Sequence, residues 1–137
     1  MRVFLLLLLS SSLPLLAGDL KINDPWIRAV PPSSTATAAF MTIENTSDHP
    51  VSVLGATSPV ATEVKPMITT KMDDGVMGME FVESFVIPAG GKRTLEPGGD
   101  HLMLMKLHEV PKAGSSVKLI LQTDTGEKTI SLDVPVR

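Results

Sequence analysis

The sequence contains no cysteine among its 137 residues, and this absence excludes several kinds of chemistry. No disulfide can hold the fold together, so the hydrophobic core alone must stabilise it. No thiolate is available as a catalytic nucleophile or as the cysteine ligand of a blue-copper electron-transfer site. A metal site in this chain must therefore use other side chains, and thioether and imidazole groups survive mild oxidants better than thiols do.

Clusters of lysine and arginine are also missing, and the formal net charge is −3. A protein that binds a phosphate backbone normally carries a basic patch, so nucleic acid is excluded as a partner. The sequence has no Gly-x-Ser-x-Gly elbow, no phosphate-binding glycine loop and no His-Glu-x-x-His helix. Acidic residues fall mainly in turns such as Asp73-Asp74, where a solvated turn is commoner than acid and base catalysis. The sequence therefore predicts a binding protein and not an enzyme.

Only one long apolar run is present, and it lies at the N-terminus. One basic residue precedes an apolar segment of the length and composition of a secretory signal peptide, shorter than the roughly 20 residues of a membrane-spanning helix. We expect residues 1–18 to be a cleaved signal peptide, which leaves 19–137 as one exported domain without stable membrane insertion. An uncleaved anchor is the alternative. Asp19 stands where a lipoprotein signal requires a lipid-bearing cysteine, so we expect a soluble product.

No stretch has a sustained apolar period of 3.6 residues, and this argues against helices. Segments rich in β-branched residues are instead separated by turn residues roughly every 8 to 12 positions. This spacing predicts an all-β single domain, an antiparallel Greek-key β-sandwich or barrel. The segments expected as strands are 19–22, 26–30, 36–45, 50–57, 69–72, 76–82, 85–88, 92–96, 100–106, 117–123 and 128–134. Asn23-Asp24-Pro25 is expected to be a turn, and Pro66 argues against a regular central strand around it.

Methionine stands out against this background, with eight residues in the chain. A strand that begins after a proline-glycine turn places His101, Met103 and Met105 on one face and leucines on the other. A second methionine-rich stretch, residues 72–79, precedes it and ends at Met79. Imidazole and thioether groups suit copper, and thioethers select Cu(I) over hard cations. If the two stretches meet in space, Met79, His101 and Met103 can converge on one ion.

A purely structural explanation of the same side chains stays open. Methionine fills gaps in protein cores, and a lone histidine among apolar residues is more often structural than a ligand. Met41 lies in an apolar strand and Met105 lies farther along its own strand, so we expect both to pack. His49 lies in a turn, and His108 has the opposite parity to His101 in a regular strand, so neither is expected to bind a metal.

Several stretches of the chain resemble the periplasmic copper chaperones of the PCu(A)C family. The segments that carry the resemblance are Trp26-Ile-Arg28, the Pro31-Pro32 loop, Ala39–Asn45, Gly75–Met79, Ile87–Gly91 and Leu95–Met105. The copper motif of the family is His or Met, ten residues, Met, twenty-one residues, His, one residue and Met. Met79, His101 and Met103 fit this spacing.

The resemblance implies a cupredoxin-like fold and a Cu(I) chaperone function in the periplasm. It also implies delivery of the ion to an acceptor, with assembly of a copper centre of cytochrome c oxidase as the destination. Cytochrome c oxidase subunit II and Sco-type proteins are the partners that the resemblance suggests, and we expect the chaperone itself to be a monomer.

The first ligand of the motif is where this chain departs from the family. The motif spacing, counted back from Met79, leads to Ile68, which cannot bind a metal. Met67 is the neighbouring residue, and a one-residue bulge at Pro66 would bring its sulfur into the same place. The predicted ligand set is then Met67, Met79, His101 and Met103. The alternatives are a three-ligand site, or a secreted interaction domain with a degenerate metal site, in which Ile68→His is expected to create binding.

Overall fold

The computed structural model describes residues 20–71, 73, 75–125 and 129–137, and every regular element in them is a β-strand. The signal peptide expected at 1–18 lies outside the described residues. The strands are β1 Leu20–Ile27, β2 Ala36–Asn45, β3 Val51–Ser58, β4 Ala61–Lys71, β5 Met77–Phe81, β6 Phe85–Ile87, β7 Lys92–Leu95, β8 His101–Leu107, β9 Ser116–Thr123 and β10 Thr129–Pro135. In these ranges there is no helix long and apolar enough to cross a membrane.

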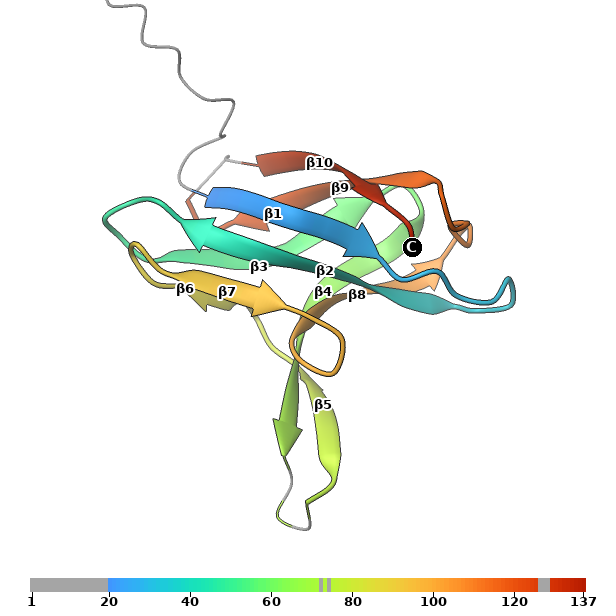
Figure 1. Ribbon diagram of the computed structural model, residues 1–137, viewed down its shortest axis with the longest axis horizontal. Helices are drawn as coiled ribbons and strands as arrows, with labels where there is room; N and C mark the ends of the chain where they lie inside the picture. Colours follow the sequence, from blue (N-terminus) through green and yellow to red (C-terminus); the bar gives the residue numbers. More distant parts are fainter. Residues whose placement is uncertain (1–19, 72, 74, 126–128) are drawn as a thin grey trace, which may run out of the picture.

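The strands form one antiparallel sheet in the order β1-β2-β8-β4-β3-β9-β10, with β5, β6 and β7 paired to β4, β3 and β2. The two ends of this order approach each other, because Ile27 and Val136 form an isolated bridge. The amide of Ala29 also donates to the carbonyl of Arg137 at 2.6 Å. The sheet therefore curls into a nearly closed barrel (Figure 1), and the predicted all-β antiparallel fold class is confirmed.

Alternation of side chains along each strand fills the interior of this barrel. On β9, Leu119 and Leu121 are fully buried, and their sequence neighbours are exposed or only partly buried. Leu102 and Leu104 of β8 join the same core cluster, as does Met41 of β2. Burial of each such side chain contributes about 1.5–3 kcal/mol. The prediction that Met41 packs in the core is confirmed.

The end of β4 and the whole of β5 form a hairpin that extends away from the rest of the barrel (Figure 1). Asp73 and Gly75 lie in the connecting turn, and Gly75 has a φ of 83°, a conformation that glycine adopts without steric strain. The predicted hairpin between these two segments is confirmed. β5 pairs only with β4 in the described sheet, so much of its surface faces solvent.

The turn expected at residues 23–25 is instead an irregularity inside a single strand. β1 pairs with β2 on both sides of it, and the register shifts between Asn23 and Trp26. Asp24 has a φ of 47°, in the left-handed region that aspartate tolerates better than most residues. A bulge absorbs the extra residues and lets the strand continue, so that Trp26 pairs with Phe40.

The prediction that Pro66 prevents a regular central strand is wrong. β4 runs through Pro66 without a break, and Pro66 pairs with Leu102 of β8. The proline ring lies at the edge of β4 that faces away from β8, close to Gly55 of β3. A Cβ atom added to Gly55 would lie 3.7 Å from the proline Cδ. On that side β4 changes partner from β3 to β5, and the carbonyl of Pro66 accepts from the amide of Val82 at 3.1 Å. The missing N–H therefore falls at a change of partner, where the ladder requires no bond from it.

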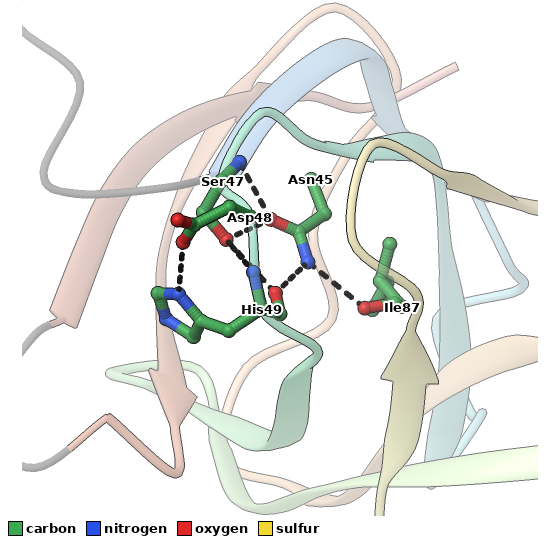
Figure 2. A network of polar contacts seen from close by, with 5 residues as sticks. All are labelled: Asn45, Ser47, Asp48, His49 and Ile87. Carbon is green, nitrogen blue, oxygen red and sulfur yellow. Dashed lines mark hydrogen bonds and ion pairs between the residues drawn. The ribbon is translucent and has the colours of Figure 1, made fainter.

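A polar network fixes the loop that follows β2 (Figure 2). The side-chain amide of Asn45, which is buried, donates to the carbonyls of His49 at 2.8 Å and Ile87 at 2.9 Å. The Asn45 carbonyl oxygen accepts from the amide of Ser47 at 3.0 Å and from its hydroxyl at 2.6 Å. The ring of His49 lies 3.2 Å from the carboxylate of Asp48 in solvent. The prediction that His49 is a surface turn residue is therefore confirmed.

Candidate metal centre

Strand β8 presents a histidine and two methionines on the face opposite to the leucine core. Leu102 and Leu104 are fully buried in the core cluster, and His101, Met103 and Met105 alternate with them. A tight turn precedes the strand and lets it begin at His101. Gly98 in this turn has a φ of 80°, and the amide of Gly99 donates back to the carbonyl of Glu96. The alternation expected for this strand is confirmed.

Strand register brings five large side chains into one row across the same outer face. Trp26 pairs with Phe40, and the pairing of Ala39 with Leu102 places the next residue of β2, Phe40, near His101. The ring centroids lie 4.7 Å apart for Trp26 and Phe40, and 6.2 Å apart for Phe40 and His101. Beyond the histidine, Met67 pairs with His101 on one side and with Phe81 on the other. His101 is therefore held between an aromatic pair and a thioether.

The hydrogen bond of the His101 ring selects its reactive nitrogen. Nδ1 of His101 lies 3.1 Å from the carbonyl oxygen of Gly99, and His101 is only 6% exposed. A carbonyl oxygen can only accept, so Nδ1 must carry the proton and donate. The neutral ring then has its lone pair on Nε2, which is the arrangement found for metal-binding histidines.

The projecting hairpin supplies further sulfur atoms to the same face. Met79 of β5 pairs with Thr69 of β4, and Thr69 has the same strand parity as Met67. The hydroxyl of Thr69 donates to the carbonyl of Gly99 at 2.8 Å, so one carbonyl holds both the base of the hairpin and the His101 ring. Met79 is 65% exposed, which is unusual for a large apolar side chain.

A groove of about 410 Å³ lies between the hairpin and the outer face of the barrel. Its lining includes His101, Met79 and Met103, three of the four predicted ligands, together with Met77. Met67, the fourth, does not line the groove and is only 7% exposed. The structure thus brings one imidazole and three thioethers to one cavity, with a further sulfur in the neighbouring strand position.

Met67 occupies its position for a different reason from the one predicted. The pairing of β4 with β8 is continuous from Glu63 to Met67, and the pairing with β5 continues from Met67 without a shift, so there is no bulge at Pro66. Met67 faces the His101 side simply because the two residues are directly paired. Ile68 has the opposite parity, and its side chain packs against the core. The residue at the family spacing therefore points away from the groove.

The donor set of this groove is soft in character. Within the described part of the chain, no three His, Cys, Asp or Glu side chains come together in a way that could hold a metal ion. Oxygen-rich sites for Ca²⁺ or Mg²⁺ thus have no counterpart among these residues. Thioether sulfur with one imidazole nitrogen favours Cu(I) among the first-row metals.

Comparison with known proteins shows the family to which this chain belongs. The model of the family described as "Putative lipoprotein LpqE-like" matches residues 20–136. The chain belongs to the LpqE-like family. The protein named "Putative lipoprotein Lxx21020", from Leifsonia xyli subsp. xyli, is 33% identical over 121 residues, which are 88% of this chain and 71% of that protein.

Solved structures share the fold of this LpqE-like chain, and PCuAC domains are among them. The copper-bound PCuAC domain from PmoF2 has a TM-score of 0.74 at 22% identity, and the match covers 88% of this chain and 93% of that one. The Cu(I) form of DR1885 from Deinococcus radiodurans has a TM-score of 0.67 at 39% identity, with 88% and 81% covered. These matches support the family resemblance seen in the sequence, and the cupredoxin-like β fold is confirmed.

Among the residues that line the groove of this LpqE-like protein, Met77 and Arg28 carry functional groups that sequence reasoning did not assign to the site. Met77 is 58% exposed and lies two positions before Met79, so the same alternation that selected Met79 could have selected it. Arg28 also lines the groove, with its guanidinium carbon 5.2 Å from the centre of the Phe40 ring. No local signal identifies Arg28, because its position depends on the pairing of β1 with β2.

Proposed function

We propose that this chain is an exported copper chaperone that binds Cu(I) through Met79, Met103 and His101, with Met67 as the fourth ligand. One observation carries the proposal: the imidazole whose Nδ1 is engaged by Gly99 opens onto the same groove as the Met79 and Met103 side chains. An oriented nitrogen with soft sulfur donors around it suits Cu(I) better than any hard cation.

The exposure of the site favours a carrier over a permanent metal centre. Met79 lies on a hairpin that projects into solvent, so an acceptor can approach the ion from that side and replace ligands one at a time. Thioethers bind Cu(I) without forming the closed thiolate cage of a structural metal site. These features support transport and delivery of the ion, and they do not call for catalysis by the protein.

The wider biological role is proposed from the resemblance to copper-binding PCuAC domains. The copper form of DR1885 and the copper-bound PmoF2 domain support Cu(I) as the cargo of this chain. We propose residues 19–137 as the copper-binding domain, the periplasm as its location and monomer as its state. Assembly of a cytochrome c oxidase copper centre is the proposed destination, with subunit II or Sco-type proteins as acceptors. The relatives carry lipoprotein names, but these 137 residues include no cysteine that could take a lipid.

Titration of the reduced protein with Cu(I) against a competing chelator tests the proposal. The parent is expected to take up one equivalent, and both His101→Ala and Met103→Leu are expected to bind more weakly by at least about tenfold, or about 1.4 kcal/mol. Met41→Leu is the matched control, since this methionine is buried in the core away from the groove. Equal copper affinity in His101→Ala, Met103→Leu and the parent would show that the site is wrong.

A second candidate is a secreted interaction domain that keeps the fold but not a useful metal site. The observation that favours it is the departure at the first ligand, where Ile68 faces the core and Met67 lies outside the groove lining. In that case the Cu(I) affinity of the parent would be no better than that of an unstructured peptide with the same number of methionines.

A further inference from the structure

The groove is much larger than one copper ion requires. Its volume is about 410 Å³, whereas a water molecule takes up about 30 Å³ of liquid. Small residues form part of its lining, namely Ala36, Ala38, Gly98 and Gly99, and they leave this space open. A metal bound by His101 and Met103 would therefore share the groove with a further group of side-chain size or larger.

A cation without a carboxylate partner lies in this groove. Among the arginines of the described ranges, Arg93 pairs with Asp100 at 2.9 Å and Arg137 pairs with Asp24 at 3.0 Å. Arg28 makes no ion pair with any described residue and rests instead over Phe40, at 5.2 Å from the ring centre. Its guanidinium is thus held in place by the ring and keeps its hydrogen-bond donors available.

Two of the three charged side chains that β4 places on the face of His101 and Met103 have the same sign as Arg28. Lys65 pairs with Met103 across β4 and β8, and Lys71 pairs with Met77 across the hairpin. Both lysines therefore lie on the face of the sheet that carries the predicted metal ligands Met67, Met79, His101 and Met103, which we call the donor face. One carboxylate of β4, Glu63, shares this face and lies 3.8 Å from Lys65. Glu80 pairs with Ile68 and therefore lies on the other face of the hairpin. A chain with a net charge of −3 thus presents a mainly cationic donor face.

We propose that this groove is the docking site for an acidic, copper-ligating loop of a partner protein. A carboxylate of the loop pairs with the Arg28 guanidinium, and a thioether or imidazole of the same loop reaches the ion between His101 and Met103. This inference rests on the proposed copper delivery and adds the chemistry by which a partner is recognised.

Docking of such a loop also accounts for the exposed apolar side chains beside the groove. Met77, Met79 and Phe81 are each at least half exposed on one face of β5. A loop in the groove would cover part of this surface and lower the local dielectric around the ion pair, which strengthens it. Charge complementarity also raises the association rate, and salt weakens this effect.

Copper transfer to synthetic peptides tests the proposal without knowledge of the partner. Three peptides of equal length carry the same Met and His residues, flanked by glutamates, glutamines or lysines. Transfer of Cu(I) from the loaded full chain is followed at low salt, and the Cu(I) affinity of each variant is measured separately. We expect the glutamate peptide to receive copper about three- to tenfold faster than the glutamine peptide.

Variants of Arg28 test whether this residue is responsible for the faster transfer to the glutamate peptide. Arg28→Gln is expected to abolish the advantage of the glutamate peptide, Arg28→Lys to retain part of it, and Arg28→Glu to favour the lysine peptide. Lys118→Gln removes an equal charge from an exposed position on β9 and is expected to retain the full advantage. Equal rates for the glutamate and glutamine peptides, or an unchanged preference in Arg28→Gln, would overturn the proposal.

The copper-free chain separates this inference from the proposed function. The glutamate peptide is expected to shift the NMR resonances of Arg28 and Trp26 in the absence of metal, whereas a failure of copper binding alone would leave that result intact. If the copper-free chain forms a dimer that Arg28→Gln abolishes, the groove takes a second copy of this chain and the acidic partner is wrong.

Discussion

Met67 of β4 and His101 of β8 lie directly opposite each other in an unbroken antiparallel ladder. Side chains paired in this way share a face of the sheet, and their Cβ atoms lie about 4.5–5.5 Å apart. The flexible methionine side chain has three rotatable bonds, so a modest change of rotamer would turn its sulfur toward Nε2 of the ring. This pairing supports the proposal that Met67 replaces the ligand that the family spacing would place at Ile68.

Paired substitutions distinguish Met67 from Met77 as the fourth donor. Leucine is close to methionine in volume, so both Met67→Leu and Met77→Leu are expected to change the free energy of unfolding by less than about 1.5 kcal/mol. Met67→Leu is expected to weaken Cu(I) binding by about tenfold in a chelator competition, and Met77→Leu by much less. The opposite ranking would assign the fourth position to Met77, which lines the groove.

The sequence suggested that Ile68→His creates metal binding if the site is degenerate, and the structure changes this expectation. Since the Ile68 side chain is partly buried and packs against the core, an imidazole there would lose this packing and be partly desolvated, at a cost of about 1 kcal/mol in the free energy of unfolding. We expect urea unfolding at lower denaturant and no gain in Cu(I) affinity.

The matched variant Met67→His puts the same group on the donor face, and it is expected to keep or improve copper binding. Tighter copper binding by Ile68→His than by the parent would contradict the orientation of these two residues.

Acidification is expected to weaken copper binding through His101. Nδ1 is engaged by the Gly99 carbonyl, so Cu(I) and a proton compete for Nε2 of the same ring. Affinity is therefore highest when the ring is neutral and falls as the pH is lowered. His101→Met replaces the nitrogen by a thioether, which does not titrate, and is expected to bind more weakly but with little dependence on pH. A pH dependence equal to that of the parent in this variant would assign the proton effect elsewhere.

Asn45 is expected to contribute to the free energy of unfolding and not to Cu(I) affinity. Its amide donates to the buried carbonyl of Ile87 and to that of His49, so Asn45→Ala removes the side-chain donor of the Ile87 carbonyl and leaves the His49 carbonyl with the Ser47 hydroxyl alone. The expected loss is about 1–3 kcal/mol in the free energy of unfolding, measured by urea denaturation. Ser47→Ala removes only a partly exposed hydroxyl of the same network (Figure 2) and is expected to cost less. Equal effects of the two substitutions would contradict the role assigned to Asn45.

The sequence predicted the parts of this site that depend on local periodicity. The alternation of His101 and Met103 with buried leucines follows from the two-residue period of a strand, and the turn before it is marked by Gly98. The position of Met67 could not be predicted in the same way, because it depends on the register between two strands that are distant in sequence. The predicted bulge at Pro66 was wrong, since proline is accommodated where β4 changes partner.

NMR of Cu(I) titrated into protein with labelled methionine methyl groups tests the central claim most directly. We predict that one equivalent of Cu(I) shifts the methyl signals of Met79 and Met103 and the Nε2 signal of His101 together, and leaves Met41 of the core unchanged. Shifts spread over the exposed methionines, with no change at His101 Nε2, would contradict the claim that these side chains form one copper site.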